Sequence, residues 1–493
     1  MAKAVTTSTA PKANNFLYIF HCVIGLFLMF GFGMIKPIAP LTPVGMQVLG
    51  IFAGLIYLWS FVSVLWPSLL GLLALGLSDY ATMPQVLFNG FGDKIPILVL
   101  FAMILFGAIQ HAGVIKYISR WFLTRKIING RPVIFSFIVI YCAYVLSALG
   151  ATTLPAILFM WSVLYSVLED VGYKKGDKYT SIMVIGTMFG AISGQAAKPF
   201  TGSALMVIAA FEKTTNIHLE YLPYMVYGFI MSSLGIVIFS LLIKFVFKPD
   251  MSKIANISTD RFEQDKLPKM TLQQKVLFTC LFGFLAIVLL PSILPQSFWL
   301  GALLNKLGAW GIVIGFVVGL CLFKIDGKPI LNFKEIVGRH VSWDVYFLVV
   351  MCMAVSGGLT ADATGIKPFL VQLFQPLLGG HSVYGFSVIL LITALIITNI
   401  ANNAVMGVLL MPIMYGFALE NGTNLPALAT AMVFMLHYAI MIPGASPYAA
   451  ILHGNTDWVE PKEIYKYGSV IVISMLVMFL LIGLPLANMI FSA

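Results

Sequence analysis

Four short segments of the sequence place small, polar or helix-breaking residues inside long apolar runs. Two of them, 149–153 and 400–404, lie near the centres of their apolar runs, and the other two, 193–203 and 443–449, each contain proline. Apart from one lysine, Lys198, the side chains available there are neutral hydroxyls and amides. These polar residues are Thr152, Thr153, Ser193, Gln195, Thr201, Ser203, Asn402, Asn403 and Ser446, and Asn399 lies just before the segment 400–404.

These residue types favour reversible binding over catalysis. No Asp or Glu lies deep in an apolar run, and no hydroxyl is paired with a base in the sequence. General acid–base chemistry and metal catalysis need such groups. The five cysteines lack Cys-x-x-Cys spacing, so neither a metal site nor a disulfide framework is predicted. We therefore expect a protein that binds a charged solute, without a cofactor, and not an enzyme.

The composition places these residues in a membrane protein. Hydrophobic residues make up 60% of the chain and charged residues 10%, whereas soluble domains carry about 25% charged residues. The net charge of +10 could suggest nucleic acid, but the basic residues fall in short loops between apolar runs, where they set membrane orientation. We predict an all-α polytopic membrane protein without a nucleic-acid partner.

Apolar runs of about 20 residues indicate transmembrane helices. Two longer apolar segments, 133–168 and 383–418, are broken by "ALGATT" and "NIANNA", and we interpret them as re-entrant helical hairpins. Eleven transmembrane helices are predicted, of which 178–212 and 425–455 are interrupted. The other nine are 16–35, 43–62, 64–80, 95–114, 222–247, 273–292, 307–323, 343–362 and 465–490.

The basic residues support this topology. With a cytoplasmic N-terminus, 23 of the 29 Lys and Arg residues fall in cytoplasmic loops and the N-terminal tail, and five fall outside. The remaining one is Lys198. Counting either hairpin as a single crossing would weaken this bias, which orients membrane proteins. We therefore predict a multi-pass protein of the cell membrane with its N-terminus in the cytoplasm.

The chain also contains a weak internal repeat. "DKIPILVLFAMILFGAIQHAGVIKYI" (93–118) aligns with "DVYFLVVMCMAVSGGLTADATGIKPFL" (344–370), and "AKPFTG" (197–202) aligns with "ASPYAA" (445–450). Each half holds five crossings and one hairpin, so the second half must be inverted. The predicted parts are a tail with the first span (1–42), a first repeat (43–248), a cytoplasmic linker (249–272) and a second repeat (273–493).

The interruptions supply the backbone groups that binding requires. Exposed N–H groups at the start of a half-helix suit an anion, and freed carbonyl oxygens suit a cation. Non-helical backbone at membrane depth is tolerated where it is buried in protein or lines a wet cavity. A single Gly or Pro could mark a simple kink, but four interruptions at related positions favour a site. We expect the four segments to meet near the middle of the membrane.

The motifs at these segments resemble those of the divalent anion/sodium symporter (DASS) family. They are "LSALGATTLPAILFM" and "TNIANNAVMGVLLMPI" at the hairpins, and "GQAAKPFTGSALM" and "IMIPGASPYAAILHG" at the interrupted helices. The resemblance implies an elevator-type transporter, a homodimer, and sodium-coupled transport of dicarboxylate, citrate or sulfate. The substrate-binding residues that it implies are Gly150, Ala151, Thr152, Thr153, Ala401, Asn402, Asn403, Lys198, Pro199, Thr201, Ser446 and Pro447, and the implied ion-binding residues are Gly194, Gln195, Asn399, Gly444 and Ala445.

The motifs differ from the family pattern in ways that leave the coupling ion and the anion open. The family has Ser-Asn-Thr at each hairpin tip, where this sequence has "GAT" and "ANN". The family also has a Thr-Pro-Pro-Asn-like interruption, and here Lys198 stands in the place of the threonine of the first one. A lysine at this depth costs a few kcal/mol unless carbonyls or an anionic substrate compensate its charge.

We hypothesise that Lys198 is a tethered cation that replaces one sodium ion and attracts the substrate. A tethered charge is not released, which fits sodium-independent exchange of two anions better than symport. The alternative is a lysine that extends to an aqueous vestibule and contacts nothing. His437, in the middle of a crossing, could be a proton-coupling group or a hydrogen-bonded core residue.

The predicted function is secondary active transport of small divalent anions, with di- or tricarboxylates favoured. One alternative is a sodium-coupled dicarboxylate or sulfate symporter, and another is an anion channel or sensor with the transporter fold. The expected partners are a small anionic substrate, the lipid bilayer and a second copy of the chain. Na⁺ is the candidate coupling ion.

Overall fold

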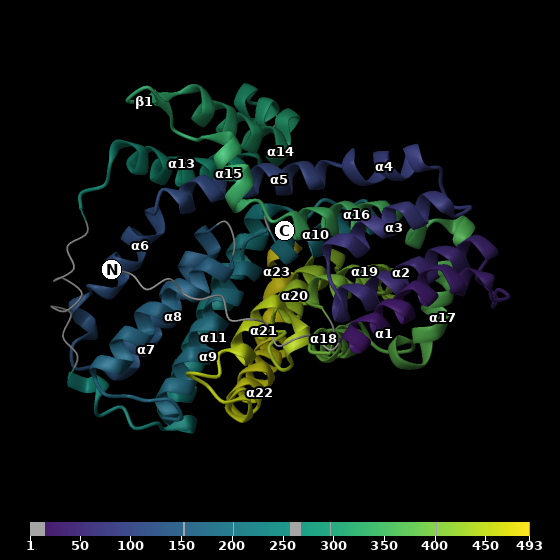
Figure 1. Ribbon diagram of the computed structural model, residues 1–493. Helices are drawn as coiled ribbons and strands as arrows, with labels where there is room; N and C mark the ends of the chain where they lie inside the picture. Colours follow the sequence, from purple (N-terminus) through teal and green to yellow (C-terminus); the bar gives the residue numbers. More distant parts are fainter. Residues whose placement is uncertain are drawn as a thin grey trace.

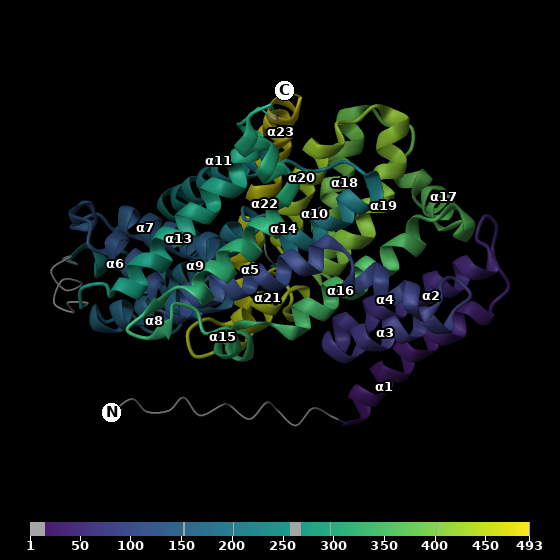
Figure 2. The same cartoon turned by 90° about the horizontal axis from the view of Figure 1, so that it is seen from above.

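The computed structural model describes residues 15–150, 153–200, 202–256, 268–295, 297–400 and 402–492. Within these ranges the chain is almost entirely helical, which confirms the predicted all-α polytopic class. Helices α7, α8, α9 and α11, within residues 132–242, gather on one side of Figure 1, and α1, α2 and α3, within residues 15–77, gather on the other with α17, residues 366–378. Helices α20 to α23, within residues 425–491, lie between them, and the view in Figure 2 keeps this order.

Two of the helices in the N-terminal part, α2 and α5, begin after residues whose side chains cap them. Thr42 accepts a hydrogen bond from the backbone N–H of Gly45, and Asp93 accepts one from Ile95, as helix N-caps do. The helices of this part are α1 (Asn15–Leu26), continued by short turns at Phe27–Gly31 and Phe32–Met34, α2 (Pro43–Phe61), α3 (Leu65–Leu77), α4 (Met83–Phe91), α5 (Lys94–His111) and α6 (Val114–Leu123).

Both segments predicted as hairpins form pairs of helices that pack against each other. Their bounds agree with the predicted ranges 133–168 and 383–418. The first pair is α7 (Pro132–Leu149) with α8 (Thr153–Asp170), and the second is α18 (Val383–Thr398) with α19 (Asn403–Asn421). That each pair enters and leaves the membrane on one side stays a prediction.

Both predicted helix interruptions are present. The span predicted at 178–212 consists of α9 (Lys178–Ala196) and α10 (Gly202–Thr215). The span predicted at 425–455 consists of α20 (Leu425–His437) and α21 (Pro447–Gly454), with one short turn (Pro443–Ala445) between them. Prolines in both gaps lack the N–H that would continue a helix, so the interruptions have a local cause.

The remaining elements connect and surround these units. Helix α14 is kinked at Gly308, whose φ of 62° is not helical. The part after the kink corresponds to the span predicted at 307–323, and the part before it was not predicted. The elements are α11 (Tyr221–Leu242) with a turn at Ile243–Phe247, α13 (Leu272–Leu289), α14 (Trp299–Leu322), the antiparallel strands β1 (Lys324–Ile325) and β2 (Lys328–Pro329), α15 (Phe333–His340), α16 (Trp343–Thr360), α17 (Ile366–Leu378), α22 (Pro461–Met478) and α23 (Leu484–Phe491), and short turns at Lys126–Ile128, Ile254–Asn256, Leu290–Ser292, Asp362–Thr364 and Phe479–Gly483.

Eight helical runs among the described residues are long and apolar enough to cross a membrane, or ten if each of two bent pairs counts as one span. The protein is therefore a multi-pass membrane protein. Helices α3, α10, α20 and α21 are shorter, so the total of eleven crossings stays a prediction. The same order of elements occurs twice, as α5, a hairpin, an interrupted span and α11, and as α16, a hairpin, an interrupted span and α22. The inverted relation of the two halves stays a prediction.

Candidate functional site

A cavity of about 560 Å³ lies where the two hairpins and the two interrupted spans meet. One wall comes from α8, α19, α21 and the residues around the gap between α9 and α10. The other wall comes from α5, α15, α16 and the residue before α3. The lining residues are Val64, Met103, Gln110, Thr153, Leu154, Pro155, Gln195, Lys198, Gly202, Ser203, Met206, Arg339, His340, Val341, Ser342, Asp344, Val345, Leu348, Asn402, Asn403, Ala404, Pro447 and Tyr448.

The predicted site residues divide into three groups in the structure. Those that line the cavity are Thr153, Gln195, Lys198, Asn402, Asn403 and Pro447. Those that lie outside its lining are Gly150, Gly194, Pro199, Asn399, Gly444, Ala445 and Ser446. Ala151, Thr152, Thr201 and Ala401 lie outside the described residues. The four predicted segments thus contribute to one cavity, and solute binding by these residues stays a prediction.

A stripe of glycines on α9 sets the position of the first interruption. Gly186, Gly190 and Gly194 are spaced four residues apart; Gly190 and Gly194 face α7, whereas Gly186 lies between Phe239 on α11 and Ile140 on α7. A methyl group on Gly190 would overlap the carbonyl oxygen of Ile140, and one on Gly194 would overlap that of Tyr144. Small residues let membrane helices approach backbone to backbone. The stripe therefore brings the end of α9 beside the end of α7.

Lys198 follows α9, and its ammonium group is buried against the end of α7. The residue is 3% exposed. Its Nζ donates hydrogen bonds to the carbonyl oxygens of Gly150, at 2.5 Å, and Ser147, at 3.1 Å. It also lies 5.6 Å from the ring centre of Phe106 on α5. The last carbonyls of a helix have no partner within it, so the ammonium takes acceptors that the end of α7 leaves free.

The contacts of Lys198 differ from those of a lysine that extends into water. Two of the three N–H groups of its ammonium are bonded to carbonyls, and among the described residues no acceptor is assigned to the third. Lys198 also lines the cavity. One buried positive charge is therefore shared between the first hairpin tip and the cavity.

The second hairpin tip presents amide groups to the same cavity. The Oδ1 atom of Asn402 accepts hydrogen bonds from the backbone N–H groups of Ala404 and Val405, at 3.1 Å and 3.4 Å, which makes Asn402 the N-cap of α19. The Oδ1 atom of Asn403 accepts from Ala404 at 2.9 Å. Because a backbone N–H bonds the amide oxygen and not the amide nitrogen, both NH₂ groups are left as donors.

Asn399 holds the second interruption in its non-helical shape. Its Oδ1 atom accepts hydrogen bonds from the backbone N–H groups of Ile440 and Met441, both at 3.0 Å. Its Nδ2 atom donates to the carbonyl oxygens of Leu395, at 2.9 Å, and Tyr438, at 3.1 Å. These four bonds use the donors and lone pairs of the amide. The predicted place of Asn399 in an ion site is untested, and its side-chain oxygen is already fully bonded.

Ser446 closes the same interruption from the other end. Its Oγ atom accepts a hydrogen bond from the backbone N–H of Ala449, at 3.0 Å, and donates one to the carbonyl oxygen of Ala439, at 2.8 Å. Ser446 is thus the N-cap of α21. This cap positions Pro447 and Tyr448 in the cavity wall. Sequence reasoning missed Tyr448, although its place directly after a predicted site residue could have identified it.

A partly buried chain of hydrogen bonds joins the two interrupted spans. Nε2 of Gln195 donates to Oγ of Ser203, at 3.1 Å, and this Oγ lies 2.9 Å from Nε2 of His437. Nδ1 of His437 lies 2.7 Å from the carbonyl oxygen of Val433. A carbonyl oxygen only accepts, so Nδ1 carries the hydrogen, and Ser203 can donate to Nε2 of a neutral ring. His437 is a hydrogen-bonded core residue in this arrangement.

Sequence reasoning also missed the opposite wall of the cavity. Arg339 belongs to a loop predicted to be cytoplasmic, and nothing in the local sequence places it beside the hairpins. Helices α15 and α16 meet at 82°, and this bend turns their junction toward the cavity. The polar residues of this wall are Gln110, Arg339, His340, Ser342 and Asp344.

The arrangement offers groups for binding an anion. The donors are the Lys198 ammonium and the amide NH₂ groups of Asn402 and Asn403, and the apolar side chains of Met103, on the other wall, and Met206, on the same wall, also line the cavity. Among the described residues, no group of three or more His, Cys, Asp or Glu side chains could hold a metal ion. What the cavity can do chemically is hold a small anion through charge and hydrogen bonds.

The family model described as "CitMHS: Citrate transporter" matches residues 55–436. The matched range includes both hairpins, the whole first interrupted span and most of α20, the first half of the second interrupted span. A comparison with curated proteins finds no match to the chain.

Proposed function

The chain belongs to the CitMHS citrate transporter family, and from this premise we propose that it exchanges small di- or tricarboxylate anions across the cell membrane by alternating access. Family membership indicates a secondary transporter of citrate or another divalent anion. The motifs that resemble the DASS family lie at the cavity that this function requires. The identity of the anion, the exchange mode and independence from sodium are the proposed part.

The observation that carries the proposal is the position of Lys198. Its ammonium is buried between two tip carbonyls and lines a cavity that also contains Asn402 and Asn403. A buried charge is costly unless it is compensated. The carbonyl dipoles compensate part of the charge, and an anion in the cavity would compensate the rest. The apolar side chains that line the cavity, such as those of Met103, Leu348 and Met206, favour an anion with a hydrocarbon backbone over inorganic sulfate.

The same position supports exchange without sodium. Carbonyl oxygens at an interrupted helix are the ligands that a transported cation would use, and the Lys198 ammonium already uses those of Ser147 and Gly150. A sodium ion a few ångströms away would be repelled by this charge. Because Lys198 cannot leave the protein, the unloaded site keeps a positive charge. That charge is best neutralised by a second anion for the return step.

The membrane arrangement is proposed on the same basis. The N-terminus is cytoplasmic, as the basic loops indicate. In this orientation Arg339, which lines the cavity, lies on the cytoplasmic side. The apolar side chains exposed on α1 and on the turn that follows it, such as Phe16 at 75% and Phe27 at 65%, would contact lipid or a second copy of the chain. A homodimer is part of the proposal.

The test is counterflow in proteoliposomes. Vesicles preloaded with citrate, a dicarboxylate or sulfate are diluted into medium with the labelled anion, with sodium or with choline. We expect labelled citrate or dicarboxylate to enter only when the vesicles are preloaded with a carboxylate, at equal rates in both media. Uptake that collapses in choline would indicate the sodium-coupled alternative, and entry without stimulation by internal anion would indicate a channel.

A further inference from the structure

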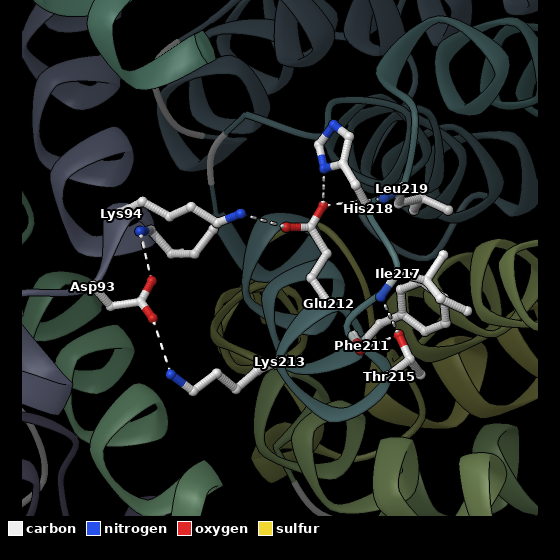
Figure 3. A network of polar contacts seen from close by, with 10 residues as sticks. Asp93, Lys94, Phe211, Glu212, Lys213, Thr215, Ile217, His218 and Leu219 are labelled. Atoms are coloured by element: carbon white, nitrogen blue, oxygen red, sulfur yellow. Dashed lines mark hydrogen bonds and ion pairs between the residues drawn. The ribbon is translucent and has the colours of Figure 1, made fainter. Parts of the chain in front are cut away.

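Five charged or titratable residues join the start of α5 to the end of α10 (Figure 3). The carboxylate of Asp93 lies 3.3 Å from Nζ of Lys213. Nζ of Lys94 lies 3.6 Å from Oε2 of Glu212, and Nδ1 of His218 lies 2.6 Å from Oε1 of Glu212. Each helix end thus contributes one acid and one base, and the two ion pairs cross between the helices in opposite senses.

Side chains on both helices of this network are also held in place by contacts other than the ion pairs. Glu212 is 9% exposed, and its Oε1 also accepts a hydrogen bond from the backbone N–H of Leu219 at 3.1 Å. Lys94 lies 5.0 Å from the ring centre of Trp310 on α14. Asp93 is also the N-cap of α5. Side chains that are already fixed lose less entropy on pairing than mobile surface side chains, so these pairs are stronger than ordinary exposed ones.

The network and the cavity lie at opposite ends of the same two helices. On α5 the cavity contacts Met103 and Gln110, in the second half of the helix, whereas Lys94 is its first residue. On α10 the cavity contacts Ser203 and Met206, in the first half, whereas the ion pairs involve the last turn. A rise of 1.5 Å per residue separates Lys94 from Gln110 by about 24 Å. Ion pairs therefore join α5 and α10 at the helix ends that do not line the cavity.

For the cavity to open toward the membrane side where the ion pairs lie, its two walls must separate. Helix α5 belongs to one wall and α10 to the other, so such a movement pulls the partners of both ion pairs apart. We propose that the Asp93–Lys213 and Lys94–Glu212 pairs form a latch. The latch stabilises the state in which both pairs are formed, and it closes the cavity toward the membrane side where the pairs lie. The inference rests on the proposed alternating access and adds the residues that set the balance between its two states.

The test measures from which membrane side the cavity can be reached. The reporter is Met206→Cys, introduced after the native cysteines Cys22, Cys142, Cys280, Cys321 and Cys352 have been replaced by alanine. Full-length protein in proteoliposomes is treated with a small membrane-impermeant thiol reagent from either side. For each variant, labelling by reagent added on the membrane side where the ion pairs lie is divided by labelling by reagent added on the opposite side. In the double variant Lys94→Met/Lys213→Met, we expect this ratio to rise about fivefold, because two ion pairs are lost from one state only.

Two controls isolate the latch. Lys94→Arg/Lys213→Arg keeps both charges and should leave the ratio unchanged. Lys306→Met on α14 removes an exposed lysine that forms no ion pair with the described residues, and should also leave it unchanged. If the methionine pair lowers the yield of folded protein, Lys94→Gln/Lys213→Gln replaces it with the same expected rise.

An unchanged ratio in the charge-free variants overturns the latch, as does an equal rise in either control. The labelling needs no substrate. The latch can therefore be supported even if counterflow shows that the anion or the exchange mode is different. Conversely, carboxylate exchange can be supported while the latch fails.

Discussion

The Nζ atom of Lys198 lies 2.5 Å from the carbonyl oxygen of Gly150, so the first interrupted span is bonded directly to the first hairpin tip. This bond joins a side chain that follows α9 to the last carbonyls of α7. It occupies carbonyl oxygens that a dissolved cation could otherwise bind. The proposed exchange mechanism therefore depends on the charge of one side chain.

Lys198→Thr should change both substrate affinity and ion dependence. Loss of the ammonium removes a charged donor, which we expect to raise the KM for the anion about tenfold or more. It also frees the carbonyls of Ser147 and Gly150 for a cation, so sodium should stimulate uptake by the variant. Counterflow with sodium or choline measures both effects. Lys367→Thr, on α17 and outside the cavity lining, is the matched control, and the same KM and sodium response in both variants would contradict the tethered-cation role.

Asn402→Asp should separate helix capping from anion binding. Aspartate caps a helix about as well as asparagine, so the variant should unfold within a few degrees of the native protein. Its carboxylate would nevertheless repel the substrate, and we expect the KM to rise about tenfold or more. The same change at Asn424, which caps α20 outside this cavity by accepting from Ala427 at 3.1 Å, should leave the KM unchanged. Equal transport by both variants would remove Asn402 from the proposed site.

Asn399→Ala should destabilise the fold without altering a direct substrate contact. Four hydrogen bonds to the backbone around the second interruption are lost, and the stranded backbone groups make the expected cost about 2–4 kcal/mol. Thermal unfolding in detergent should show a clear fall in Tm. Asn305→Ala removes one bond, to the carbonyl of Gly301 on α14, and should cost about 0.5 kcal/mol or less. Equal Tm values for the two variants would show that Asn399 does not hold the interruption.

Gly190→Ala should force α9 away from α7. The added methyl group would overlap the carbonyl oxygen of Ile140, and overpacking of this kind costs about 1–3 kcal/mol. Gly315 on α14 has no neighbouring atom within 4 Å of an added methyl group, so Gly315→Ala should be neutral or slightly stabilising. Thermal unfolding compares the two variants. A Gly190→Ala protein as stable as Gly315→Ala would mean that the helices do not need this close approach.

Most of the fold could be predicted because its signals are local. Apolar length indicates helices that cross a membrane, and breakers such as Pro199 and Pro443 indicate where a helix stops. The helix bounds found for both hairpins and both interrupted spans follow from these two signals. The early start of α14 was missed because Gly308 interrupts its helical geometry at the predicted boundary.

Much less of the candidate site could be predicted. Thr153, Asn402 and Asn403 were identified because they are polar residues in apolar runs, and they do line the cavity. Asn399 and Ser446 have the same signal but lie outside the cavity lining, and both the donors and the acceptors of their side chains bond to backbone, since the sequence does not show which way a polar side chain turns. Arg339 and Asp344 were missed because they line the cavity only through the bend between α15 and α16.

The sequence by itself determined which segments are apolar helices, where they are interrupted and which polar groups accompany the interruptions, because each of these depends on neighbouring residues. Only the tertiary structure decided what those groups contact. Lys198 meets the carbonyl of Gly150 across 48 residues of chain, because the glycines of α9 allow two helix backbones to touch. Asp93 meets Lys213 because α5 and α10 pack side by side, which no local pattern records.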